Sequence, residues 1–203
     1  MKENSNYTKI LKIFEDNKGC ISRKEINEAK ISSWFLYDFV KKNNLNKVAP
    51  GFYVSKDFIP DDYFILQKRF PKYVFSGMSA LYLHHLTDKI PAFITVSAPL
   101  GYNPSREKNK ILMVHWIKDV DIYGMGITKA KTIFDNEVFV YDRERIICDL
   151  VKNRDKYDGE TFNKAIKIYF KEKPNQIKLF EYAKVMNIEK KMFEIMEIIM
   201  NEN

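Results

Sequence analysis

"SRKEINEAKISSWFLYDFVKKNNLNKVAPGFYVS", residues 22–55, contains two helix starts and a turn in close succession. Ser22 stands three residues before Glu25, and this spacing predicts a capping box at the first helix start. Ser32 is the expected cap of the second helix, because a serine oxygen can accept from the unpaired amides of a first turn. Pro-Gly at 50–51 predicts a turn between two short strands. The segment therefore predicts a short helix, a second helix and a hairpin.

A further helix is predicted just before this segment. Residues 7–19, "YTKILKIFEDNKG", have apolar residues at helical spacing and end on a glycine that can stop a helix. The order helix, short helix, helix, hairpin is typical of a winged helix-turn-helix, whose third helix enters the DNA major groove. The charge is also uneven, since residues 1–56 have eleven basic and six acidic residues, whereas the other 147 have 23 and 21. We therefore expect a DNA-binding domain at 1–56 and a second domain at 57–203.

The outward face of the third predicted helix is the candidate interface. If the apolar residues Leu36, Phe39 and Val40 are buried, then hydroxyl, aromatic and lysine side chains project outward. Such side chains can contact bases and phosphates. The expected DNA-binding residues are Ser22, Arg23, Lys24, Ser33, Trp34, Tyr37, Lys41, Lys42 and Lys47. The alternative is that the aromatic pair packs on a protein, which would make the unit a winged-helix protein-interaction module.

The second domain is predicted to be α+β. Apolar stretches at 92–99, 111–118, 128–134 and 137–142 predict strands of a small antiparallel sheet, and helical patterns run from 142 to the end of the chain. Several basic residues could extend the contact along the DNA backbone, although a solvated face is an equal alternative. These possible additional contacts are Lys68, Arg69, Lys72, Arg106, Lys108 and Lys110.

Residues 142–153 pose the question of catalysis, because charged side chains surround a short apolar stripe there. Asp142 is a good helix cap, and Arg145 and Asp149 have the spacing of an ion pair within one helix. These structural tasks are favoured over acid–base chemistry. His115, flanked by apolar residues in a predicted strand, is expected at the edge of the core. A metal-dependent nuclease using Asp142 or Asp149 is kept as a weaker alternative.

Other motifs of catalysis and ligand binding are absent from the sequence. It has no HExxH, GxSxG, P-loop or GxGxxG pattern. Its two cysteines, Cys20 and Cys148, are far apart, which argues against a disulfide framework or a zinc site. No signal peptide or transmembrane stretch is readable. We therefore expect a cytoplasmic protein that is not an enzyme, with no catalytic residues, cofactor, metal site or membrane partner.

Several stretches, taken in their order, resemble a known family. They are "GFYVS", "DDYFILQKRFPKYVFSGMSALYLHHLTDKIP", "ITVSAPLGYNPS" and "VYDRERIICDLVKNRDKYDGETFNKAIKIYF", the last continued by "LFEYAKVMNI". The last stretch resembles the C-terminal domain of the AbiEi antitoxins, which belong to the type IV toxin–antitoxin, abortive-infection (phage-defence) AbiE systems. These proteins have a winged helix-turn-helix at the N-terminus, so the resemblance covers roughly residues 5–200.

The resemblance implies two tasks and no enzymatic site. The winged helix would act as an autoregulating transcriptional repressor, binding inverted repeats in double-stranded operator DNA of its own promoter. The C-terminal domain would counteract a nucleotidyltransferase-like toxin without forming a stable complex with it. The family's repressor positions correspond here to Arg23, Lys24, Ser33, Trp34, Tyr37, Lys41 and Lys47.

Overall fold

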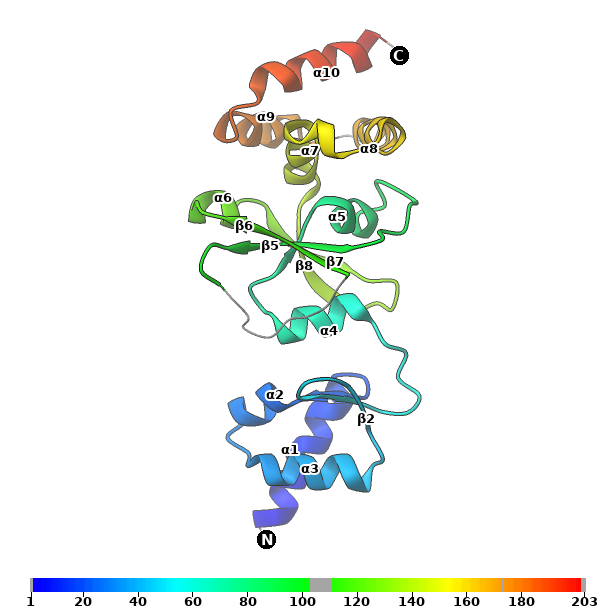
Figure 1. Cartoon of the computed structure of the whole chain (residues 1–203), viewed down its shortest axis with the longest axis vertical. Helices are drawn as coiled ribbons and strands as arrows, with labels where there is room; N and C mark the ends of the chain where they lie inside the picture. The colour runs from blue at the N-terminus through cyan, green and yellow to red at the C-terminus, as the bar shows by residue number, and fades with distance from the viewer. Residues whose placement is uncertain (1, 103–110, 173, 202–203) are drawn as a thin grey trace. The chain divides into compact units, whose positions relative to one another are not determined.

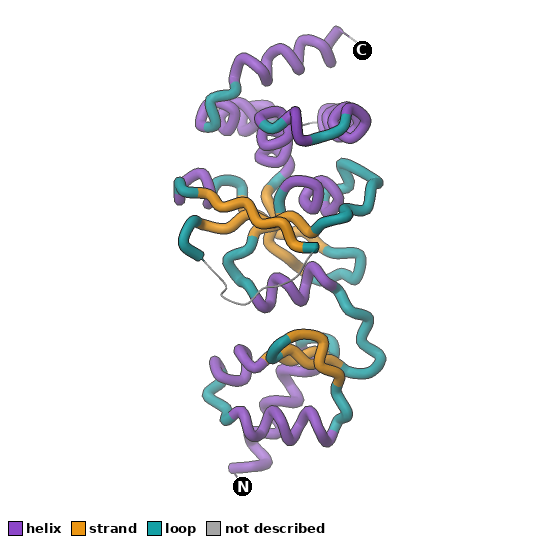
Figure 2. The backbone as a smooth tube through the Cα atoms, viewed as in Figure 1, coloured by secondary structure: helices purple, strands orange, loops and turns teal. Residues whose placement is uncertain are grey.

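The computed structural model describes residues 2–102, 111–172 and 174–201. It divides into two compact units, Met1–Lys68 and Arg69–Asn203 (Figure 1). Helices and strands occur in both units, as the tube in Figure 2 shows, and the expected α+β class is confirmed. Within the described ranges, no helix is both long and apolar enough to cross a membrane.

The first unit contains a helix-turn-helix followed by a β-hairpin at residues 46–54, the wing. Its elements are α1 (Lys2–Asp16), β1 (Cys20–Ser22), α2 (Arg23–Glu28), α3 (Ser33–Lys42), β2 (Asn46–Ala49), β3 (Phe52–Val54) and most of α4 (Asp62–Arg69). The capping box is confirmed, because the Ser22 side chain accepts from the Glu25 amide and the Glu25 carboxylate accepts from the Ser22 amide. Ser32 caps α3 as expected. The predicted hairpin gains a third strand, β1, and the antiparallel sheet has the order β1-β3-β2.

This small sheet has an apolar cluster on each face. One cluster joins Ile21 and Tyr53 of the sheet to helix residues that include Ile26, Leu36 and Phe39. The other joins Cys20, Phe52 and Val54 to Ile65 of α4, with Phe58 and Phe64 packed against them. Because side chains alternate along a strand, the buried triplet Phe52–Val54 supplies both clusters.

The second unit is built on a five-stranded sheet with the order β6-β5-β4-β8-β7. Its strands are β4 (Val74–Phe75), β5 (Ile94–Pro99), β6 (Leu112–Ile117), β7 (Ile127–Lys131) and β8 (Glu137–Tyr141). Its helices are α5 (Gly77–Leu83), α6 (Val120–Gly124), α7 (Arg143–Lys152), the 3₁₀ turn η1 (Arg154–Lys156), α8 (Gly159–Lys171), α9 (Gln176–Val185) and α10 (Glu189–Asn201). Helix α7 contacts α5, α8, α9 and α10, and so forms the centre of the helical part (Figure 1).

The prediction of an antiparallel sheet in this unit was wrong, because the sheet is mixed. Strands β5 and β6 are parallel, as are β4 and β8, whereas β4–β5 and β7–β8 are antiparallel. A parallel neighbour requires a long crossover, and the stretch from Pro99 to Leu112 is long enough for one. The central strand β4 was not foreseen, since two buried residues are too short to show a strand period.

Candidate DNA-binding surface

Helix α3 presents an aromatic and basic face to solvent. Leu36 and Phe39 are fully buried, whereas the side chains of Trp34 and Tyr37 are 61% and 49% exposed. Lys41 is exposed as well. Trp34, Tyr37 and Lys41 follow one another at steps of three and four residues, which places them on one side of a helix. Trp34 is steadied by an edge-on contact with Phe35, with the ring centroids 5.0 Å apart. The predicted division of this helix into an apolar and an outward face is therefore confirmed.

The wing turn brings Arg23 to the hairpin. The amide of Arg23 donates to the carbonyl oxygen of Gly51 at 2.7 Å. Gly51 has φ +71°, in the region that favours glycine, and a Cβ atom on it would lie 3.3 Å from the Cβ of Arg23. The glycine of the Pro-Gly turn thus allows the close approach of the turn to the first residue of α2.

Tyr53 of β3 connects three of the expected DNA contacts, although the sequence analysis did not single it out. It lies opposite Lys47 of β2 in the strand register. Burial raises the pKa of its phenol, the neighbouring Tyr37 raises it further, and the charge of Arg23 opposes this shift. Lys47 of the wing is therefore its strand partner, and the charges of Tyr37 on α3 and Arg23 on α2 act on its phenol. The register around the Pro-Gly turn is the signal that could have found it.

Two other expected contacts are engaged in local ion pairs. The ammonium of Lys42 lies 2.7 Å from the Asp38 carboxylate and 5.6 Å from the centre of the Tyr7 ring, on the side of α3 that faces α1. Lys24 is 3.8 Å from Glu28, and both side chains are exposed. Exposed ion pairs of this kind are weak, so both lysines can still meet a phosphate.

Ser22 has a structural role in place of the expected DNA contact. Its side chain is buried, and its hydroxyl donates to the Glu25 carboxylate at 2.7 Å. Ser33, by contrast, is partly exposed at the start of α3, beside Trp34. We therefore exclude Ser22 from the interface and retain Ser33.

Lys68 is also held inside the first unit by a polar network. Its ammonium donates to the Glu25 carboxylate at 2.9 Å and to the side-chain oxygen of Asn17 at 3.0 Å. Asn17 donates in turn to the same carboxylate at 3.0 Å. Burial raises the pKa of Glu25, but the hydrogen bonds and charge of Lys68 and the bonds from Ser22 together lower it below its ordinary value. Lys68 is therefore a poor candidate for a DNA contact.

The remaining expected backbone contacts belong to the second unit. The guanidinium of Arg69 lies over the Phe70 ring at 4.9 Å, and the ammonium of Lys72 lies over the Tyr102 ring at 5.5 Å. Arg106, Lys108 and Lys110 lie outside the described residues.

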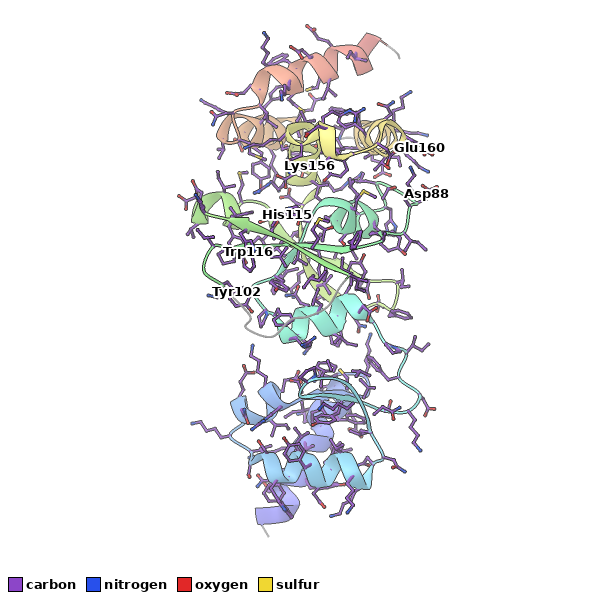
Figure 3. The ribbon with its side chains drawn as sticks, in the orientation of Figure 1. Asp88, Tyr102, His115, Trp116, Lys156 and Glu160 are labelled. Carbon is purple, nitrogen blue, oxygen red and sulfur yellow. The ribbon has the colours of Figure 1, made fainter. Side chains whose placement is uncertain are left out.

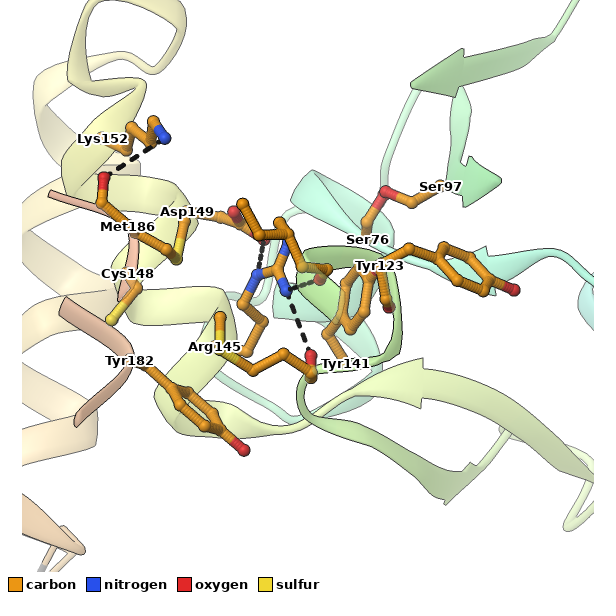
Figure 4. Close-up of polar contacts among 12 residues, drawn as sticks. Ser76, Ser97, Tyr123, Tyr141, Arg145, Cys148, Asp149, Lys152, Tyr182 and Met186 are labelled. Atoms are coloured by element: carbon orange, nitrogen blue, oxygen red, sulfur yellow. Dashed lines mark hydrogen bonds and ion pairs between the residues drawn. The ribbon is translucent and has the colours of Figure 1, made fainter. Parts of the chain in front are cut away.

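The charged residues at the start of α7 cap the helix and form an ion pair within it, as the sequence predicted. Asp142 caps the helix by accepting from the Arg145 amide at 2.8 Å, and it also binds Lys178 at 2.8 Å. Arg145, only 2% exposed, pairs with Asp149 at 3.1 Å and donates to the carbonyl oxygens of Ile122 and Met125 (Figure 4). These contacts satisfy a buried guanidinium and tie α6 to α7.

The histidines do not gather into a metal site. His84 bonds through Nε2 to the Tyr141 carbonyl at 2.8 Å, and burial lowers its pKa. His115 is an exposed residue of β6, so its predicted place at the edge of the core was wrong. Among the residues that the structure describes, no group of three His, Cys, Asp or Glu is placed to hold a metal ion.

Three helices and a β-hairpin, with an exposed aromatic and basic face on α3, give the first unit the architecture of a helix-turn-helix domain. Residues 9–56 match the model of the family described as "Transcriptional regulator, AbiEi antitoxin". Residues 9–56 are thus similar to the regulator domain of AbiEi antitoxins, as the sequence resemblance predicted. No curated protein matches the chain.

Proposed function

We propose that the protein is the antitoxin and autorepressor of a type IV toxin–antitoxin operon. In this proposal each chain reads one half of an inverted repeat in its own promoter with the first unit. The observation that carries it is the α3 face, where Trp34 and Tyr37 are exposed beside Lys41 in an AbiEi regulator domain. Large aromatic residues on a surface helix usually mark a binding site when they cluster with polar ones.

The residues divide into two roles. Ser33, Trp34 and Tyr37 face the base edges and supply sequence preference through hydrogen bonds and apolar contacts. Arg23, whose amide donates to Gly51 of the wing turn, and Lys47 of β2 bind phosphates on one side of the recognition helix, and Lys41 binds them at its far end. Lys24 and Lys42 add to the positive electrostatic potential of this surface when their ion pairs with Glu28 and Asp38 open. The residue arrangement therefore supports one continuous interface over α2, α3 and the wing.

Affinity should come mainly from phosphate contacts, so binding should weaken steeply as salt rises. The test is a gel shift with the upstream DNA of the protein's own gene, at two salt concentrations, against a scrambled duplex. Changing Arg23, Lys24 and Lys41 together to Ala should abolish the specific shift and reduce the salt slope by about one per lost phosphate contact. Circular dichroism should show that the fold is retained.

A control variant loses the same number of positive charges as the first triple variant, but outside the proposed interface. Lys9, Lys12 and Lys56 are exposed lysines of the same unit outside the proposed interface. Changing all three to Ala removes three positive charges as well, and should preserve the specific shift. If the first triple variant binds its operator as tightly as the unchanged protein, the proposed interface is wrong. The unit would then be better explained as a protein-docking module anchored by Trp34 and Tyr37.

The second half of the proposal assigns the antitoxin role to residues 57–203, which counteract a nucleotidyltransferase-like toxin without a stable complex. The support is the resemblance of this part of the chain to the C-terminal domain of AbiEi antitoxins. A nucleotidyltransferase gene next to this one should cause growth arrest when it is expressed alone. Co-expression of the chain should relieve that arrest. Relief that persists in the triple variant of Arg23, Lys24 and Lys41 would separate antitoxin action from repression.

A further inference from the structure

Two adjoining hollows lie in the second unit, between β6 and the segment from α7 to Asp158. One has a volume of about 470 Å³, and the other has a volume of about 380 Å³. They share Gly77, His115, Lys156 and Tyr157 as lining residues. Gly77 permits this junction, because a Cβ atom there would lie 3.4 Å from the Tyr157 hydroxyl, and its φ of +52° favours glycine. Figure 3 labels His115 on the sheet and Lys156 on the segment that faces it.

The larger hollow is lined by several basic residues and by two acids that make contacts within the protein. Lys118, Lys152 and Lys156 all line it. Of its two acids, Asp149 is paired with Arg145 at 3.1 Å. Asp119 caps α6, where its carboxylate accepts from the amides of Asp121 at 2.9 Å and Ile122 at 3.0 Å. Arg145 thus neutralises Asp149, whereas Asp119 leaves one negative charge against the three lysines.

Among the residues that the structure describes, none of the three lysines forms an ion pair with a carboxylate. Lys152 donates to the carbonyl oxygen of Met186 at 3.3 Å, a neutral acceptor. Within the part of the chain that the structure describes, Lys118 and Lys156 make no ion pair. Their charge also acts on His115: partial desolvation by the residues around the hollow lowers the pKa of this exposed imidazole, and the charge of Lys156 lowers it further. An uncompensated positive field inside a hollow favours an anion.

The smaller hollow is apolar on its far side. Ile90, Pro91, Phe93 and Met113 line it, together with Ala92. Ile90 is 81% exposed and Phe93 is 49% exposed, so their apolar surface remains uncovered around the hollow. An apolar or aromatic ligand group would gain by covering it. One end of the combined site is therefore cationic. The other is mainly apolar beside the ion pair of Lys89 with Asp158, whose charged atoms lie 3.2 Å apart.

We propose that these hollows form one binding site for a small organic phosphate of about the size of a mononucleotide. Its phosphate lies among Lys118, Lys152 and Lys156, and its planar or apolar group lies against Ile90, Phe93 and Met113. Both volumes fall within the roughly 300–1,000 Å³ of small-molecule pockets. The site is independent of the DNA surface, and the proposal holds whether or not the first unit is a repressor.

The test is calorimetric titration of the full chain with AMP, GMP, CMP, UMP and inorganic phosphate. At least one mononucleotide should bind more tightly than inorganic phosphate. Changing Lys118 and Lys156 to Ala should weaken that binding by at least about tenfold, since each lost charged hydrogen bond can remove one such factor. Changing Lys184 and Lys190, two exposed lysines of α9 and α10, is the matched control and should leave binding unchanged.

Proton NMR of the histidine side chains is a second test, because His115 lines both hollows. The ring-proton signal of His115, assigned by its loss in His115→Gln, should shift on addition of the nucleotide that binds. The signals of His84, held by the Tyr141 carbonyl, should stay in place. Three outcomes would overturn the proposal: no binding of any probe at millimolar concentration, equal binding of inorganic phosphate and nucleotides, or binding that the Lys118 and Lys156 changes leave intact.

Discussion

At the residue scale, Glu25 illustrates how one side chain can serve several elements. Its carboxylate accepts from the amide and hydroxyl of Ser22, which fixes the start of α2. It also accepts from Asn17, after α1, and from Lys68 of α4. The capping box was visible in the sequence because its partners are three residues apart. The bond from Lys68 spans 43 positions, and no local pattern reports it.

Glu25→Gln should make the first unit less stable near pH 7 and less sensitive to acid. The pKa of Glu25 is lowered in the folded chain, so the carboxylate stabilises the fold above its unfolded pKa. That contribution is lost as the pH falls through the folded pKa, below the ordinary value of 4.5. The expected loss at neutral pH is about 1–3 kcal/mol. Urea unfolding at pH 7 and pH 3 checks this, and equal pH dependence in both proteins would contradict it.

Trp34→Ala should impair operator recognition without impairing the fold. The side chain is 61% exposed, so the free energy of unfolding should change by no more than about 0.5 kcal/mol. Discrimination between operator and scrambled DNA should fall, while the salt slope stays the same because no phosphate contact is lost. Gel shifts at several salt concentrations measure both quantities. Leu36→Ala, at a fully buried position, is the contrasting variant and should cost about 2–5 kcal/mol.

At the scale of elements, α7 organises the second unit through one buried cation. Arg145 reaches back to two carbonyl oxygens at α6 and lies 4.4 Å from the centre of the Tyr141 ring of β8. The i,i+4 pair with Asp149 was predicted from spacing alone. The carbonyl contacts were not, because α6 is more than twenty residues earlier and the sheet between them decides where it lies.

Arg145→Ala should destabilise the second unit by about 3–5 kcal/mol, since it leaves Asp149 uncompensated and two carbonyl oxygens without their donor. Changing both Arg145 and Asp149 to Leu removes the charges together and should cost less than the single change. Urea unfolding of the three proteins tests this order. A double variant that is as unstable as Arg145→Ala would show that the carbonyl contacts, not the lone carboxylate, carry the cost.

At the scale of the whole molecule, the first compact unit extends beyond the small sheet to Lys68 of α4. The expected boundary at residue 56 stays a prediction, while the compact unit in the structure runs to Lys68. Residues 57–68 add Phe58, Phe64 and Ile65 against the outer face of the small sheet, and Lys68 against Glu25. A fragment that ends at 56 would expose Phe52 and Val54 to water.

A fragment of residues 1–68 should therefore unfold cooperatively and at a higher temperature than a fragment of residues 1–56. Burial of the three apolar side chains is worth roughly 1.5–3 kcal/mol each if complete, and less for the partly buried pair. The longer fragment should also retain a salt-sensitive shift of operator DNA. Calorimetry and gel shifts measure the two properties. Equal melting of the two fragments would indicate that residues 57–68 contribute nothing to the unit.

The sequence by itself determined the helix starts, the wing turn, the outward aromatic face of α3 and the pairing of Arg145 with Asp149. These features depend on residues a few positions apart, whose geometry the helix or turn already sets. Only the tertiary structure decided the parallel pairings β4–β8 and β5–β6, the burial of Ser22 and the ion pair of Lys68 with Glu25. It alone also decided the pairing of Tyr53 with Lys47 and the cationic hollow of the second unit. Most of these features depend on residues far apart in the chain, and packing of the complete core is what brings them together.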